Sequence, residues 1–138
     1  MERREAFRAA FDAFDPAKIA KYTAKDVERV MTAPGVVKNR GKIAATINNA
    51  QQFLKIQKEF GSFDAFIWQF VNGKTMQNAF TKLSDLPSET EESMAMSQDL
   101  KKRGFKFVGP TICYAFIQAA GLVNDHLVCC FRYSQLQP

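Results

Sequence analysis

The residues whose types and spacing point to chemistry lie in the C-terminal third of the chain. The run from Asp99 to Thr111, DLKKRGFKFVGPT, combines basic side chains with two glycines and a proline. Gly104 permits the positive φ that ends a helix, and Gly109 followed by Pro110 suits the start of the next helix. Free N–H groups at a helix N-terminus bind phosphate. The run therefore predicts two helices joined by a hairpin that holds a nucleic-acid backbone.

Individual groups in this run have distinct expected roles. Lys102 and Lys106 add positive charge, Thr111 adds a hydroxyl, and Gly104 and Gly109 shape the backbone. Contacts of this kind read the phosphate and not the base, so binding is independent of sequence. The same pattern also fits a plain interhelical turn. The apolar Phe105, Phe107 and Val108 suit either interpretation, because a hairpin must pin itself to the core.

A second basic patch, Lys38-Asn39-Arg40-Gly41-Lys42, precedes a long helical stretch. Its Lys38 and Arg40 are candidates for a further phosphate contact. A solvated helix start is an equally good interpretation of the same residues.

A histidine and a cysteine form the second candidate site. His126 and Cys130 stand four residues apart, which places them on one face if the segment is helical. Imidazole nitrogen and thiolate sulfur are both good zinc ligands, but a structural zinc needs four. Cys129 points to another face, and Cys113 lies on an apolar face of the preceding helix. From these residues alone, a core histidine beside a buried cysteine is the favoured interpretation.

Composition limits the classes of protein that the chain can belong to. Its 138 residues carry a formal charge of +5, which suits a polyanionic partner. No apolar run approaches the roughly 18 residues that span a bilayer, and the N-terminus does not resemble a signal peptide. Three cysteines do not make a disulfide framework. We expect a single domain over residues 1–133 in a reducing compartment, with a disordered tail at 134–138.

The elements that position these residues are helical, because apolar side chains recur at helical spacing along nearly the whole chain. We predict an all-α fold with no strand pair. Residues 75–89 form an irregular connection, and the helix-hairpin-helix element covers about 91–120. The expected helices are 2–13, 16–20, 24–32, 38–60, 63–71, about 90–103, 110–120 and 125 to about 132.

Two strings, Ser97 to Tyr114 and Val123-Asn124-Asp125-His126 with Cys130, resemble 3-methyladenine DNA glycosylase, type I, of the helix-hairpin-helix glycosylase superfamily. The resemblance covers residues 2–133. It implies an enzyme that hydrolyses the N-glycosidic bond of 3-methyladenine in alkylated double-stranded DNA. It also implies a structural zinc with His126 and Cys130 as two of its ligands, and it favours a DNA contact at the Lys38–Lys42 patch.

The resemblance further implies that the family's N-terminal segment is absent, because Met1 matches a point inside the family's second helix. That segment holds the other two zinc ligands, a cysteine and a histidine, and the glutamate and aromatic residues that recognise the base. We therefore expect weak or no activity from these 138 residues. Catalytic residues are not assigned, since Asn124 occupies the position of the aspartate found in most of the superfamily.

The released base is cationic in DNA and leaves as a neutral molecule, so no general acid is required. The remaining work is to flip the nucleotide and bind the charged base against aromatic faces. The alternatives are a non-catalytic helix-hairpin-helix module that only binds DNA, and a helical scaffold without a nucleic-acid role. The resemblance implies a bacterial cytoplasmic, nucleoid-associated monomer that binds no membrane.

Overall fold

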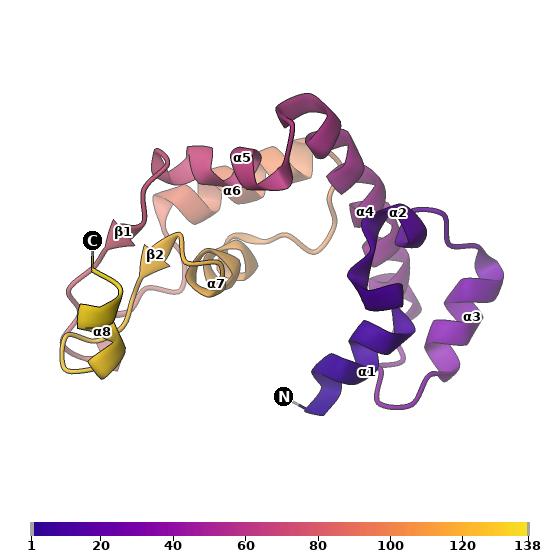
Figure 1. Ribbon diagram of the computed structural model, residues 1–138, viewed down its shortest axis with the longest axis horizontal. Helices are drawn as coiled ribbons and strands as arrows, with labels where there is room; N and C mark the ends of the chain where they lie inside the picture. Colours follow the sequence, from indigo (N-terminus) through magenta and orange to yellow (C-terminus); the bar gives the residue numbers. More distant parts are fainter. Residues whose placement is uncertain (1, 138) are drawn as a thin grey trace. The chain divides into compact units, whose positions relative to one another are not determined.

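Helices make up most of the regular structure, as the period of apolar side chains predicts (Figure 1). The computed structural model describes residues 2–137. They divide into two units. Unit 1 contains the chain up to Phe63 together with Arg103–Phe107, and unit 2 contains Asp64–Lys102 and the chain from Val108 onward.

Unit 1 is built from helices whose starts are capped by polar side chains. The Asp15 carboxylate accepts hydrogen bonds from the Ala17 and Lys18 amides, and Thr23 forms a capping box with Asp26. The two helices begin at residues 16 and 24, as the sequence predicts. The helices of unit 1 are α1 (Glu2–Ala10), the 3-10 turn η1 (Asp12–Phe14), α2 (Pro16–Ile19), α3 (Ala24–Thr32) and α4 (Arg40–Phe60).

The core of unit 1 lies where α1, α2 and α3 pack against α4. Val30 is fully buried, and Phe11 stacks on Phe7 and Tyr22. Burial of this apolar surface is the main term that stabilises the unit. The buried residues of the cluster are Ala10, Phe11, Ile19, Val30, Val36, Ile43 and Ala50.

Unit 2 packs its helices around Phe66, Met96 and Ile117, which are fully buried. Ile67, next to Phe66, is buried as well. The elements of this part of the chain are α5 (Phe63–Trp68), η2 (Gln69–Val71), β1 (Met76–Gln77), η3 (Leu83–Asp85), α6 (Glu91–Lys102), α7 (Pro110–Ala119), β2 (Val123–Asn124) and α8 (Phe131–Gln135).

One strand pair departs from the prediction of helices alone. Met76 pairs with Val123 and Gln77 with Asn124 in a parallel bridge, so β1 and β2 lie side by side (Figure 1). Two residues per strand are too few to leave the alternation that marks a strand in a sequence. The pair fastens the long connection after η2 to the segment that follows α7, and the fold remains all-α.

The C-terminal segment also differs from its prediction. Residues 125–130 do not form a helix, and α8 begins only at Phe131. The Val128 amide donates to the Phe80 carbonyl, 3.0 Å away, instead of forming a helical bond. Residues 134 and 135, which we expected in a disordered tail, belong to α8, and the Gln77 amide donates to the Leu136 carbonyl.

No helix within residues 2–137 has the length and apolar character needed to cross a bilayer.

Candidate nucleic-acid interface and metal-ligand pair

The hairpin has the boundaries that its sequence predicts. α6 ends at Lys102, Gly104 has a φ of +87°, and α7 begins at Pro110. Gly109 precedes that proline with a φ of −66°, so its conformation is open to any residue. A Cβ added to Gly109 would meet nothing within 4 Å. Packing inside the protein therefore does not require a glycine at this position, and space beside the backbone is open.

The N-terminus of α7 in unit 2 lacks a side-chain cap. Gly109 is its N-cap residue and has no side chain to accept a hydrogen bond. The Cys113 amide bonds to the Gly109 carbonyl, so the amides of Thr111 and Ile112 precede the first intrahelical bond. In unit 1, by contrast, Asn39 caps α4 by accepting from the Lys42 amide. Uncapped amides at the positive end of a helix dipole attract an anion.

Unit 1 holds the middle of the hairpin through two asparagines of α4. The side-chain oxygen of Asn49 accepts a hydrogen bond from the backbone amide of Lys106 at 2.8 Å. The side-chain NH₂ of Asn49 donates to the backbone carbonyl of Lys106 at 2.9 Å. The Asn48 amide donates to the Gly104 carbonyl at 2.8 Å. These three bonds fix the backbone on both sides of Phe105. No local pattern in the sequence indicates this clamp, because its partners are 56 or 57 residues apart.

An ion pair secures the beginning of the same segment. Arg103 donates two hydrogen bonds to the Glu59 carboxylate, at 2.7 and 3.2 Å, and its guanidinium lies 5.0 Å from the centre of the Phe60 ring. The guanidinium lowers the pKa of Glu59 below its ordinary value. Arg103 is therefore committed to the fold of unit 1, and the predicted charge of the hairpin rests with Lys102 and Lys106.

The other predicted DNA-binding residues fall into different settings. Lys102, Lys106 and Thr111 are exposed, and so is Lys38 ahead of α4. Arg40 instead forms a two-point ion pair with Glu28 of α3, which lowers the pKa of that carboxyl. A phosphate at Arg40 would have to compete with Glu28, whereas Lys38 is open to solvent.

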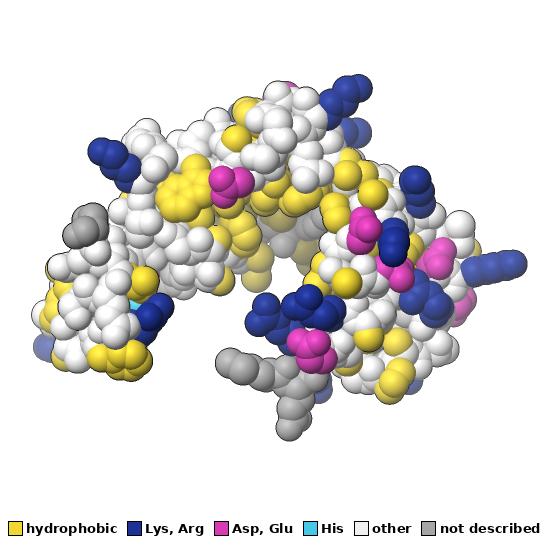
Figure 2. Space-filling view, in the orientation of Figure 1, with side chains coloured by type: hydrophobic (Ala, Val, Ile, Leu, Met, Phe, Trp, Pro, Cys, Tyr) yellow, Lys and Arg dark blue, Asp and Glu magenta, His cyan; other side chains and the backbone are white. Residues whose placement is uncertain are grey.

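Positive charge is concentrated in unit 1. Its part of the sequence has 14 Lys and Arg against seven Asp and Glu, a formal charge of +7, whereas unit 2 has five against seven, a charge of −2. Figure 2 shows Lys and Arg side chains over the helices of unit 1 on the visible face. A polyanion is therefore attracted mainly to unit 1.

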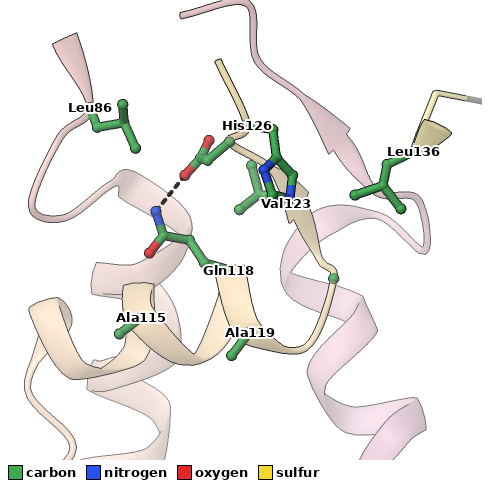
Figure 3. Close-up of a pocket in the computed structure, with 9 residues that line it drawn as sticks. Leu86, Ala115, Gln118, Ala119, Val123, His126 and Leu136 are labelled. Atoms are coloured by element: carbon green, nitrogen blue, oxygen red, sulfur yellow. Dashed lines mark hydrogen bonds between the residues drawn. The ribbon is translucent and has the colours of Figure 1, made fainter. Parts of the chain in front are cut away.

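The segment after α7 is organised by one carboxylate. Asp125 accepts hydrogen bonds from the Tyr114 hydroxyl, from the Gln118 amide at 2.8 Å (Figure 3) and from the Asn78 amide at 2.7 Å. Burial and the neighbouring Asp125 carboxylate raise the pKa of Tyr114 well above its ordinary value. The carboxylate thus joins α7 to the residue after β1 and fixes the position of the next residue, His126.

His126 and Cys130 approach each other, although not by the predicted route. The Cys130 sulfur lies 3.7 Å from the His126 Nδ1 atom, in a non-helical turn closed by the bond from the Cys130 amide to the Leu127 carbonyl. Zinc–sulfur and zinc–nitrogen bonds at the tetrahedral angle place the two ligand atoms about 3.5 Å apart. The pair therefore fits two positions of a zinc site.

The remaining cysteines do not extend this pair. Cys113 is buried in α7, where burial raises the pKa of its thiol, and Cys129 is exposed. Among residues 2–137, no group of three or more His, Cys, Asp or Glu is arranged to hold a metal ion. His126 and Cys130 therefore stand as a pair, with no third candidate ligand beside them in the part of the chain that the structure describes.

A pocket of about 470 Å³ lies beside His126 in unit 2 (Figure 3). His126, Gln118 and Asp125 contribute its polar groups, and most of the remaining wall is apolar. The lining residues are Leu86, Ala115, Gln118, Ala119, Gly121, Val123, Asp125, His126 and Leu136.

Asn124 has a structural role in this arrangement. It is buried, donates to the Gln77 side chain at 2.9 Å and to the Tyr133 carbonyl at 3.2 Å, and accepts from the His126 amide at 3.3 Å. These contacts satisfy its amide within the protein. They agree with leaving Asn124 without a catalytic role.

Comparison with known proteins places this geometry in a family. The chain matches the methyladenine glycosylase family over residues 1–133. It is 47% identical over 138 residues to DNA-3-methyladenine glycosylase 1 of Escherichia coli (strain K12), which covers all of this chain and 74% of the relative. The chain belongs to the methyladenine glycosylase family.

Two further members of the methyladenine glycosylase family support the assignment. The DNA-3-methyladenine glycosylase of Haemophilus influenzae is 47% identical over 130 residues, which span 94% of this chain and 70% of the relative. The 3-methyladenine DNA glycosylase I of Staphylococcus aureus, whose structure addresses 3-methyladenine recognition, superposes with a TM-score of 0.91 at 42% identity. That match covers 94% of this chain and 69% of the other.

Proposed function

We propose that this chain is a DNA-3-methyladenine glycosylase, which hydrolyses the N-glycosidic bond of 3-methyladenine in alkylated DNA. The uncapped N-terminus of α7, which follows the Gly104–Gly109 segment in the sequence, is the structural observation that carries the proposal. Family membership supplies the reaction. Double-stranded DNA is the proposed substrate form.

The residues of this chain contribute chiefly to DNA binding. The amides of Thr111 and Ile112 donate to a backbone phosphate, and Lys102 and Lys106 supply charge. Contacts to the DNA backbone allow the protein to bind at any DNA sequence. Selectivity therefore comes from the base that is flipped. Because 3-methyladenine is cationic and leaves as a neutral base, its departure needs no proton donor. We assign no catalytic residue within residues 2–137.

Release of 3-methyladenine from methylated duplex DNA tests this function. We expect release above the buffer rate in a single-turnover assay with excess protein, and DNA binding that weakens as salt rises. A slow rate relative to the Escherichia coli relative stays the prediction made from the sequence, and a rate within tenfold of that relative would contradict it. Binding independent of salt would refute the DNA interface.

A non-catalytic DNA-binding module is the second candidate. It is favoured by the contrast between a complete hairpin and the lack of an assigned catalytic side chain among residues 2–137. Salt-dependent binding to methylated DNA without any base release would establish this alternative. A helical scaffold, the third interpretation, requires that Lys106 and Gly109 can be replaced without loss of DNA binding.

We infer that His126 and Cys130 provide two ligands of a structural zinc. The 3.7 Å separation of Nδ1 and Sγ supports this assignment, since it matches the tetrahedral spacing. A bound zinc would tie the segment after β2 to whatever supplies the other ligands.

Metal analysis of the purified protein tests the zinc assignment. We expect stoichiometric zinc in the wild type and at least a tenfold loss in His126→Ala, because removal of one ligand weakens a structural site strongly. Cys129→Ala is the matched control, since Cys129 is exposed and outside the pair, and it should keep its metal. Wild-type protein without zinc would exclude the site.

We also propose that the protein acts as a monomer associated with the nucleoid. Scattering or sedimentation at micromolar concentration would test the oligomeric state.

A further inference from the structure

Phe107 is an aromatic side chain that the fold does not use. The sequence predicts that it pins the hairpin to the core, but 63% of its surface is exposed, whereas Phe105 and Val108 are half-buried. The prediction for Phe107 is therefore wrong. An exposed ring of this size gains little from burial within unit 1.

The backbone of Phe107 is also strained. Its φ is +58°, in the left-handed region where a side chain with a Cβ is disfavoured. The asparagine clamp holds the preceding residue at both its amide and its carbonyl, so the conformation is imposed by α4 and not by packing of the ring. Strain that the surrounding structure maintains at an exposed residue points to a role outside the fold.

The surroundings of Phe107 favour DNA as the partner of this ring. Phe107 follows Lys106, which is exposed, and both lie in unit 1, which carries a formal charge of +7. In a nucleic-acid strand, each phosphate that a lysine attracts is bonded to a deoxyribose with an apolar face. A side chain next to a phosphate-binding lysine therefore meets the sugar before it meets a base edge.

We propose that Phe107 contacts DNA directly, with its ring against the deoxyribose next to the phosphate that Lys106 attracts. The inference rests on the proposed function and adds to it an apolar contact that salt does not screen. The strained backbone of Phe107 presents the ring to solvent, and the clamp from Asn49 keeps it there.

Anisotropy titrations of a labelled duplex test this contact with Phe107→Gly and Phe107→Asn. Glycine and asparagine both tolerate a positive φ, so the melting temperature should stay within about 2 °C of wild type or rise. The dissociation constant should rise about tenfold, and the salt slope should not change, because no charge is lost. Lys106→Ala should instead reduce the slope by about 0.9.

Phe14→Gly is the matched control. Phe14 has a φ of +60° and is 46% exposed, but it lies in η1 and stacks on Phe11. Its replacement should leave the DNA affinity within twofold of wild type. An equal loss of affinity in Phe14→Gly would show a general effect of the substitution and would overturn the proposal.

Several results would refute the contact. Wild-type affinity in both Phe107 variants would exclude it, and unfolding of both variants would show that the ring is structural. A loss that differs more than threefold between A·T-rich and G·C-rich duplexes would place the ring on a base and not on the sugar. If the wild-type protein does not bind DNA, the proposed function is refuted. That result differs from loss of affinity in the Phe107 variants alone, so the two failures can be told apart.

Discussion

A Gly109→Asp substitution is expected to lower DNA affinity about 100-fold while raising the stability of the protein. The new carboxylate would cap α7 by accepting hydrogen bonds from the amides of Thr111 and Ile112. These two amides are the proposed hydrogen-bond donors to the DNA phosphate. Loss of charge-assisted bonds to phosphate, with repulsion between carboxylate and phosphate, is on the order of 3 kcal/mol. The cap and the helix dipole would stabilise the fold by about 0.5 kcal/mol.

DNA affinity and melting temperature, measured on the same preparation, check the expected fall in affinity and the expected rise in stability. The opposed changes separate a DNA contact from a folding defect, because a misfolded variant would lose affinity and stability together. Gly109→Asn is the matched control: it offers a similar cap without charge, and we expect a loss of only about tenfold. Open space around Gly109 makes both side chains admissible. Wild-type affinity in Gly109→Asp would remove α7 from the interface.

Local signals in the sequence were sufficient for the hairpin and the helix starts. Gly104 and Pro110 act on their own backbone, and Asp15 caps the helix that follows it, so each is legible from neighbouring residues. The pair formed by His126 and Cys130 is a different case. His126 and Cys130 are adjacent as predicted, but a turn brings them together where a helix was expected.

The features that were missed depend on partners distant in sequence. Asn49 looks like an ordinary polar residue of a long helix, and only the folded chain places it against Lys106. Asp125 was expected to begin a helix that runs to about residue 132. Its carboxylate instead accepts a hydrogen bond from the side chain of Asn78, 47 residues earlier, and the segment after Asp125 is not helical.

Each of the two units has its own feature that attracts an anion, and formal charge reveals only one of them. Unit 2 has a formal charge of −2 and yet contains the uncapped N-terminus of α7. A helix dipole is local and partly protected from salt, whereas the lysines of unit 1 act at longer range and are screened. We therefore expect long-range attraction to depend on unit 1, and the final phosphate contact to depend on α7.

An Asp125→Ala substitution should destabilise unit 2 by about 3 kcal/mol, because three donors, two on α7 and one directly after β1, lose one shared acceptor. Thermal melting would show this as a fall of roughly 10 °C. Tyr114→Phe removes only one of the three donors and should cost about 1 kcal/mol.

A third variant, Asp125→Asn, shows whether the carboxylate stabilises unit 2 through its charge and hydrogen bonds or only by filling space. If Asp125 only filled space, Asp125→Asn would behave as wild type, since its shape is nearly the same. We expect Asp125→Asn to be intermediate, because an amide oxygen is a weaker acceptor than a carboxylate and its NH₂ faces one of the three donors. Asp125 directly precedes His126, so its loss should leave the histidine less firmly positioned. Asp125→Ala should therefore bind zinc less tightly than Tyr114→Phe does. Wild-type melting in Asp125→Ala would show that the network adds nothing to stability. The position of His126 would then depend on the β1–β2 bridge and on the bond from its amide to the Asn124 side chain.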